Sequence, residues 1–325
     1  MADYKGIKGF KVQYLSADPS DPIIGQTWYN STSKDLKYTG VTTAAAWATG
    51  NPLNTARYAL GGAGTQTAAL AFGGTDTANT GATEEYDGAT WSPSNPINTA
   101  RNYLAGCGTQ TTGLAFGGNT TPPPANTGAT EEYDGASWTN SNPLNTARLA
   151  LAGAGTQTAA LAFGGSSTAA TGATEEYDGN SWTSSNPMIT ARVYVGGAGT
   201  QTAGLVFGGY TTTPTGATEE YDGISWTSNP TGLNTVRRKL AGCGTQTAGL
   251  AFGGNPVPTG ATEEYDGSTW TSSPASLATA RFSLGAAGTQ ASALGFGGYT
   301  GTANSAATEE YTGVGAALTK TITVS

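Results

Sequence analysis

The sequence TGATEEYDG spans residues 171–179, and close variants recur near residues 81, 128, 216, 260 and 305. Each copy carries two adjacent glutamates, here Glu175 and Glu176, and paired carboxylates are a common device of glycoside hydrolysis. Adjacent residues on a strand point to opposite faces, so the two carboxylates of one copy do not face each other. Because the copies repeat regularly, we expect structural glutamates, one of them pairing with a repeat arginine or capping backbone amides between neighbouring units.

The motif belongs to a longer repeat with a constant order of marker residues. Each unit opens with an arginine, continues through a hydrophobic run that ends in Phe-Gly-Gly, and closes with the glutamates, a tyrosine and a tryptophan. Successive arginines lie about 44 to 47 residues apart, and the variation falls between the double glycine and the glutamates. The arginines are Arg57, Arg101, Arg148, Arg192, Arg237 and Arg281, and the tryptophans are Trp47, Trp91, Trp138, Trp182, Trp226 and Trp270.

The pattern inside one unit is typical of short β-strands. Leu161 and Phe163 lie on one face of a predicted strand, and Ala160 and Ala162 lie on the other. Glycines and Asn-Pro pairs separate the runs, as turns require. Four strands of roughly five or six residues with four short connections need about 44 residues, the size of one propeller blade. No segment shows a sustained 3.6-residue period, which disfavours helical repeats.

The repeat resembles the kelch repeat of β-propellers. In the third unit the matching residues are Arg148, Gly164, Gly165, Tyr177, Asp178 and Trp182. The resemblance covers roughly residues 50–315, and the Gly-His and Trp-Asp signatures of WD-type repeats are absent. It implies an all-β fold, a six-bladed kelch-like β-propeller of four-stranded antiparallel blades, in which the strand after each arginine lines the axis. We expect an N-terminal extension over residues 1–46 and the propeller over residues 47–325.

Two possibilities remain open for the strand that completes the last blade. The sixth unit has no tryptophan at the expected place, and Trp47 lies 44 residues before Trp91. The strand around Trp47 would complete that blade and leave no open edge. Alternatively, residues 317–325, ALTKTITVS, would supply the strand with Leu318, Ile322 and Val324 on one face. A variant with a seventh blade would use the segments GQTWYN and DLKYTG.

The composition argues against an enzyme. The chain contains no histidine, which removes the usual proton carrier at neutral pH and the commonest nitrogen ligand for transition metals. The repeat shows no asymmetric polar cluster, so we expect no catalytic residues, no cofactor and no metal site. One aspartate at each Asp-Gly turn is a weak calcium signal and leaves that ion open. The run GGAGTQT, residues 61–67, lacks the third glycine of a dinucleotide fingerprint and predicts a turn.

Charge and hydropathy limit the partners. The net charge is −8, and Lys5, Lys8, Lys11, Lys34 and Lys37 all precede residue 40. An acidic body without a basic stripe predicts no nucleic-acid binding. No stretch approaches the roughly 20 apolar residues of a membrane span, and the N-terminus lacks the apolar core of a signal peptide. We therefore expect a soluble chain.

Cys107 and Cys243 occupy the same position in the second and fifth units. Those units lie opposite each other in a six-membered ring, beyond the roughly 7 Å that a disulfide can bridge between Cα atoms. We expect two free, buried thiols.

One face of the expected propeller carries the sequence variety. The loops after Gly-Gly differ from unit to unit, whereas the Gly-Thr-Gln and Asp-Gly turns are nearly constant. Variable loops on a rigid scaffold commonly carry recognition, so Tyr210, Tyr299, Asn119 and Asn255 are our candidate ligand-binding residues, suited to stacking on a sugar or hydrogen bonding to it. Tolerated loop variation without a ligand is the alternative.

The N-terminal segment differs from the repeats. GQTWYN and KDLKYT predict a β-hairpin with Trp28 and Tyr29 in one arm and Leu36 and Tyr38 in the other. The segment resembles the short attachment segments of bacteriophage tail-fibre and other virion proteins. The resemblance implies a homo-oligomeric virion protein that binds other virion proteins through this segment and a host glycan through the propeller. The alternative is an extracellular or cytoplasmic kelch-like lectin or protein-interaction module.

Overall fold

The computed structural model describes residues 12–20, 25–41, 44–120, 125–315 and 317–322. Within these residues, all regular secondary structure is β-strand. The same residues contain no helix that is long and apolar enough to cross a membrane. The chain divides into two compact units, Ala46–Tyr311 and a second unit made of Met1–Ala45 with Thr312–Ser325. Lys5, Lys8, Lys11 and residues 121–124 of one variable loop lie outside the described part.

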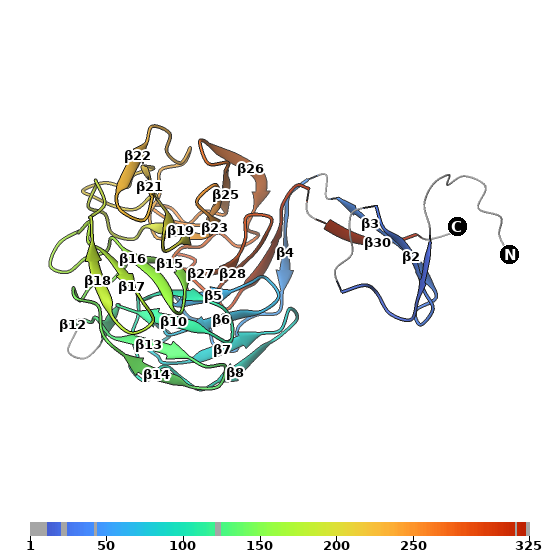
Figure 1. The fold of residues 1–325 in the computed structure, drawn as a ribbon, viewed down its shortest axis with the longest axis horizontal. Helices are drawn as coiled ribbons and strands as arrows, with labels where there is room; N and C mark the ends of the chain where they lie inside the picture. The colour runs from blue at the N-terminus through green and yellow to red at the C-terminus, as the bar shows by residue number, and fades with distance from the viewer. Residues whose placement is uncertain (1–11, 21–24, 42–43, 121–124, 316, 323–325) are drawn as a thin grey trace. The chain divides into compact units, whose positions relative to one another are not determined.

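The larger unit repeats one four-stranded antiparallel sheet, and Figure 1 shows the copies in chain order around a common centre. Each sheet joins two hairpins in the strand order of the chain, except that the last sheet takes its fourth strand from the N-terminal side. The first sheet is β5 (Gly61–Gly64), β6 (Ala69–Phe72), β7 (Thr83–Tyr86) and β8 (Trp91–Ser94). The second is β9 (Ala105–Gly108), β10 (Gly113–Phe116), β13 (Thr130–Tyr133) and β14 (Trp138–Ser141), with the small pair β11 (Asn119–Thr120) and β12 (Ala125–Asn126) in its loop.

The remaining sheets follow the same order. The third is β15 (Ala152–Thr156), β16 (Ala159–Phe163), β17 (Thr174–Tyr177) and β18 (Trp182–Ser185). The fourth is β19 (Gly196–Thr200), β20 (Ala203–Phe207), β21 (Thr218–Tyr221) and β22 (Trp226–Asn229). The fifth is β23 (Ala241–Thr245), β24 (Ala248–Phe252), β25 (Ala261–Tyr265) and β26 (Trp270–Ser276), and the last is β27 (Gly285–Gly288), β28 (Ser292–Phe296), β29 (Thr308–Thr312) and β4 (Ala46–Gly50).

The second strand of each sheet is buried on both faces, because each sheet packs between two neighbours. In β16, Phe163 packs against Trp226 of the next sheet, with ring centroids 5.1 Å apart. On the opposite face, Ala160 shares a buried cluster with Phe116 of the preceding sheet. Large side chains on one face thus meet small ones on the next, which fills the space between sheets.

The strand around Trp47 completes the last sheet. β4 lies beside β29, and the Trp47 indole packs 4.9 Å from Phe252 and 5.0 Å from Tyr311. The other tryptophans make equivalent contacts, as Trp91 does with Phe296 and Tyr86. The alternative that residues 317–325 supply this strand is wrong, since β30 (Ala317–Thr321) pairs with β3 (Asp35–Val41) of the smaller unit.

The smaller unit is one sheet in the order β1-β2-β3-β30. The predicted hairpin is confirmed, because β2 (Thr27–Asn30) pairs antiparallel with β3 and places Tyr29 opposite Leu36. β1 (Gln13–Leu15) pairs parallel with β2. The segments considered for a seventh blade therefore form β2 and β3 of this separate sheet.

The expected boundary needs one correction. Residues 47–325 were all expected in the repeat unit, but residues 312–325 group with the N-terminal segment because β30 extends its sheet. Of the residues expected on one face of that strand, Leu318 has no described side chain and Val324 lies outside the described residues.

Candidate functional site

The first glutamate of every TEEY motif forms a buried ion pair with the arginine that opens its own repeat. Arg101 Nη1 lies 2.7 Å from Glu131 Oε1, and both side chains are fully buried. The other pairs are Arg57–Glu84, Arg148–Glu175, Arg192–Glu219, Arg237–Glu263 and Arg281–Glu309. The same carboxylates accept backbone N–H groups of the linker, as Glu175 does from Asn145 at 2.7 Å. The expected structural role of this glutamate is confirmed.

The second glutamate of each motif accepts a hydrogen bond from the tyrosine of the next sheet. Tyr221 Oη donates to Glu176 Oε1 at 2.5 Å, and Tyr86 Oη donates to Glu310 at the same distance. The remaining pairs are Tyr133–Glu85, Tyr177–Glu132, Tyr265–Glu220 and Tyr311–Glu264. Burial and these bonds raise the pKa of Tyr133, Tyr177 and Tyr221 to about 12. Both glutamates of the motif therefore have structural roles.

The repeat tryptophans and glutamines also join neighbouring sheets. Each indole N–H donates to a threonine of the preceding sheet at 2.9–3.0 Å. The glutamine of each Gly-Thr-Gln turn donates to two backbone carbonyls of the preceding sheet, as Gln157 does to Gly113 and Tyr133. The constant polar residues of the repeat thus form their hydrogen bonds within the scaffold. A binding site is therefore expected where the repeat changes.

The repeat changes at the residue two positions after each arginine. These residues are Ala59, Tyr103, Ala150, Tyr194, Lys239 and Ser283, and all have positive φ values of 49–59°. Each backbone N–H donates to the carbonyl of its equivalent in the preceding repeat at 2.8–2.9 Å, and the N–H of Ala59 donates to Ser283, which closes a cycle. We call these residues the axial ring. Positive φ costs roughly 1–2 kcal/mol at each non-glycine residue. The hydrogen bonds of the cycle offset this cost and hold the backbone of the axial ring in its positive-φ conformation.

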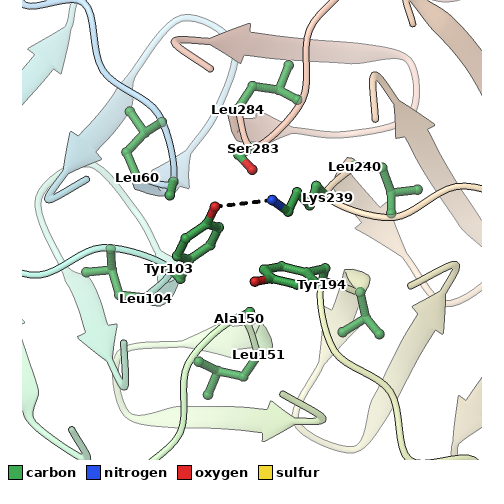
Figure 2. Close-up of a pocket in the computed structure, with 12 residues that line it drawn as sticks. Leu60, Tyr103, Leu104, Ala150, Leu151, Tyr194, Lys239, Leu240, Ser283 and Leu284 are labelled. Carbon is green, nitrogen blue, oxygen red and sulfur yellow. Dashed lines mark hydrogen bonds between the residues drawn. The ribbon is translucent and has the colours of Figure 1, made fainter. Parts of the chain in front are cut away.

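The axial ring surrounds a cavity of about 100 Å³. Residues such as Leu60, Leu151 and Leu240 also line it, and their side chains point away from its centre into the packing between sheets (Figure 2). Figure 2 shows Tyr103, Tyr194, Lys239 and Ser283 converging on its centre. Polar and aromatic groups therefore meet here, in a part of the repeat that is not symmetric.

Lys239 is the cation of this cavity. Its Nζ donates to Tyr103 Oη at 3.3 Å and lies 4.7 Å from the ring centroid of Tyr194 and 5.4 Å from that of Phe282. Aromatic faces attract a cation electrostatically. Burial lowers the pKa of Lys239 and raises the pKa of Tyr103 and Tyr194.

Two of the residues predicted from the variable loops lie beside aromatic or cationic partners. The ring of Tyr299 lies 5.6 Å from Tyr58 and 5.5 Å from Phe282, and Tyr58 lies 6.4 Å from Tyr103. Tyr299 therefore belongs to the aromatic cluster that reaches the cavity.

The guanidinium carbon of Arg238 lies over the Tyr210 ring, 4.4 Å from the ring centroid. Asn119 and Asn255 instead hold local structure. The Asn119 carbonyl accepts from the Asn79 side chain at 2.8 Å, and Asn255 forms a backbone bridge with Arg238.

The expectation that the repeat lacks an asymmetric polar cluster is wrong. Sequence reasoning missed Tyr103, Tyr194, Lys239 and Ser283, because they lie just after the constant arginine, in a segment treated as part of the scaffold. Aligning the repeats on that arginine would have shown the signal, since the second following residue reads Ala, Tyr, Ala, Tyr, Lys and Ser.

The cysteines and aspartates do not contribute to this site. Cys107 and Cys243 are free and buried, as predicted, and burial raises the pKa of both thiols to about 12. The turn aspartates bind their own turns, as Asp178 accepts from the N–H groups of Asn180 and Ser181 at 2.8 and 2.7 Å. No group of three or more metal-binding side chains occurs within the described ranges.

No protein-family model matches the chain, and no curated protein matches it either.

Proposed function

We propose that this chain is a non-enzymatic binding protein, built as a six-bladed kelch-like β-propeller that recognises its ligand at the axial ring. Three observations support the blade count and the closure. The four-stranded sheets follow one another in chain order, the inner strand β27 contacts β5, and the hydrogen-bond cycle of the axial ring has one member per repeat. A ring closed in this way leaves only short, protected strand edges.

The observation that carries the binding function is the break in symmetry at the axial ring. The repeated glutamates, tyrosines, tryptophans and glutamines all hold the sheets together, whereas the axial ring varies around a cavity. Pockets with apolar walls and a few convergent polar groups are the usual ligand sites of proteins. The aromatic cluster of Tyr58, Tyr103, Tyr194, Phe282 and Tyr299 suits a ligand with flat apolar faces, such as a sugar ring.

Within this proposal, the smaller unit attaches the protein to a larger assembly, most simply a phage virion in which the chain is a fibre or appendage. Its first strand β1 lies at the edge of the sheet, with Tyr14 76% exposed and Val12 47% exposed. An unpaired strand edge with exposed apolar side chains favours pairing with another chain. The protein would then be a homo-oligomer bound to other virion proteins.

The binding function is tested by screening the full-length protein against bacterial surface polysaccharides. Tyr194→Ala should weaken binding to any recognised glycan by about tenfold or more, because a stacking face is lost. Ile224→Ala is the control, since it removes a large side chain that is 69% exposed and lies outside both the axial ring and the smaller unit, and it should bind like the wild type. Equal binding by the Tyr194→Ala variant would place recognition elsewhere on the molecule.

The virion proposal is tested by the solution mass of the full chain and of a shortened chain of residues 44–315. A defined oligomer that becomes a monomer on shortening supports attachment through the smaller unit. Two monomers would contradict attachment and would favour the second candidate, a cellular kelch-like lectin or interaction module that uses the same face.

A further inference from the structure

We propose that the axial cavity binds a carboxylate, and that this carboxylate belongs to an acidic sugar at the end of a glycan. The inference rests on the proposed binding function and adds the chemical class of the ligand.

The axial site carries positive charge with no protein anion to balance it. Every repeat arginine is paired with a glutamate, whereas Arg238 and Lys239 take part in no ion pair among the residues that the structure describes. Lys239 is instead surrounded by Tyr103, Tyr194 and Phe282. Lys239 is half-buried, and shielding an ammonium group from water without an anionic partner is unfavourable, so an incoming anion would be stabilised here.

The hydrogen-bond donors around the cavity fit a carboxylate. Lys239 Nζ and Tyr103 Oη lie 3.3 Å apart, and both point to the centre of the cavity (Figure 2). Ser283 is only 9% exposed beside them, and its hydroxyl lies next to the Tyr103 phenol in the same cavity. A carboxylate has two oxygens with about four acceptor sites, so it can accept from all three groups at once.

The shape of the site favours the end of a glycan over a longer segment. The axial ring encircles the cavity of about 100 Å³, which is open to solvent at its mouth, so a ligand would enter end-on. The rings of Tyr58, Phe282 and Tyr299 extend the aromatic surface outward from Lys239. A terminal sugar ring would lie against these faces with its carboxylate at Lys239, an arrangement that a neutral sugar cannot match.

The test compares three probes on the full-length protein by calorimetry and by NMR of the Lys239 side chain. The probes are methyl β-D-glucuronide, which has ring and carboxylate, methyl β-D-glucoside, which has the ring alone, and acetate, which has the carboxylate alone. We expect the glucuronide to bind at least about tenfold more tightly than either other probe and to shift the Lys239 signals. Lys239→Met should remove the preference for the glucuronide.

Lys34→Met is the matched control, because Lys34 is an exposed lysine of the smaller unit that also has positive φ, 62° against 56° for Lys239. It should bind all three probes like the wild type. Lys239→Arg should keep part of the preference, since the charge remains.

The outcomes separate the inference from the function on which it rests. Equal affinity for glucuronide and glucoside, both weakened by Tyr194→Ala, would overturn the proposal that the site recognises a carboxylate. It would leave the proposed glycan-binding function intact. If an acidic peptide binds in a Lys239-dependent manner and the glucuronide does not bind, the proposal that the carboxylate belongs to a sugar is overturned. No binding of any probe, and no polysaccharide hit in the screen, would overturn both proposals.

Discussion

At the scale of single residues, the paired glutamates show how one strand serves two neighbours. Glu175 and Glu176 are adjacent and chemically identical, but a strand directs them to opposite faces. Glu175 reaches the arginine of its own repeat, and Glu176 reaches the tyrosine of the next sheet. The motif that suggested a catalytic pair therefore contains two different structural contacts.

This difference predicts unequal effects of one substitution at adjacent positions. Glu175→Gln leaves the Arg148 guanidinium buried without its counter-charge and should lower the free energy of unfolding by about 3–5 kcal/mol. Glu176→Gln keeps an oxygen that accepts from Tyr221 and should cost about 1 kcal/mol. Guanidinium unfolding of both variants measures the difference, and equal losses would contradict the separate roles.

The tyrosines predict loss of stability at alkaline pH. The pKa of Tyr133, Tyr177 and Tyr221 is raised from 10.0 to about 12 in the folded protein, so the fold favours the protonated phenol. The stability from these groups is fully present below pH 10 and is lost as the pH rises through about 12.

Tyrosinate absorbance and circular dichroism, followed together along a pH titration, check this expectation. Ionisation should coincide with unfolding, because the phenolate would face a glutamate. Tyr221→Phe should reduce the steepness of the alkaline transition, and tyrosines that ionise near pH 10 without unfolding would contradict the role of these bonds.

At the scale of strands, the two inner strands of a sheet place a glycine opposite an alanine, and the methyl group can lie on either strand. In the third sheet, Gly153 pairs with Ala162, and a Cβ at Gly153 would lie 2.4 Å from Phe116 Cζ. In the last sheet the pair is reversed, with Ala286 opposite Gly295. A Cβ at Gly295 would lie 2.9 Å from Phe252 Cε2, so Phe252 occupies the space that the exchange leaves.

This exchange predicts energetic coupling between the paired positions. Gly295→Ala alone should overpack the sheet against Phe252 and destabilise the protein by about 1–3 kcal/mol. The double variant with Ala286→Gly restores the arrangement of the other repeats and should recover most of that loss. A double-mutant cycle from denaturant unfolding measures the coupling, and additive effects would contradict it.

At the scale of the whole molecule, the last sheet of the larger unit is completed by a strand from the far end of its sequence. β4 precedes the first repeat and completes the last sheet. Trp47 Nε1 then donates to Thr262 at 2.9 Å, the same bond that the other repeat tryptophans make. The first and last repeats are also joined where Gln66 donates to the Tyr311 carbonyl at 2.6 Å.

Closure by β4 predicts a sharp difference between two shortened chains. A chain that begins at Asn51 lacks Trp47 and leaves the outer edge of β29 without its partner strand, so it should lose about 3–5 kcal/mol for the missing indole alone. A chain of residues 44–315 keeps β4 and should unfold near the midpoint of the larger unit in the full protein. Thermal unfolding compares them, and equal midpoints would show that β4 is not needed for closure.

The scaffold was predictable from sequence to a large extent, and the candidate site was not. Period-2 patterns, turn residues and recurring markers indicated repeated four-stranded sheets and the hairpin of Trp28 and Tyr29. Tyr299 and Tyr210 were placed near the relevant face because variable loops were visible in the repeat alignment. Lys239 and Ser283 were missed, because a single changed residue beside a constant arginine is a weak signal until its equivalents are known to meet.

The sequence by itself determined the all-β repeat, the free cysteines and the structural nature of the glutamates. These properties follow from local periodicity and from repetition, which act within one unit of the chain. Only the tertiary structure decided that Trp47 completes the last sheet, that residues 312–325 join the smaller unit, and that Lys239 meets Tyr103. Such contacts join residues far apart in the chain, and the packing of complete sheets against one another brings them together.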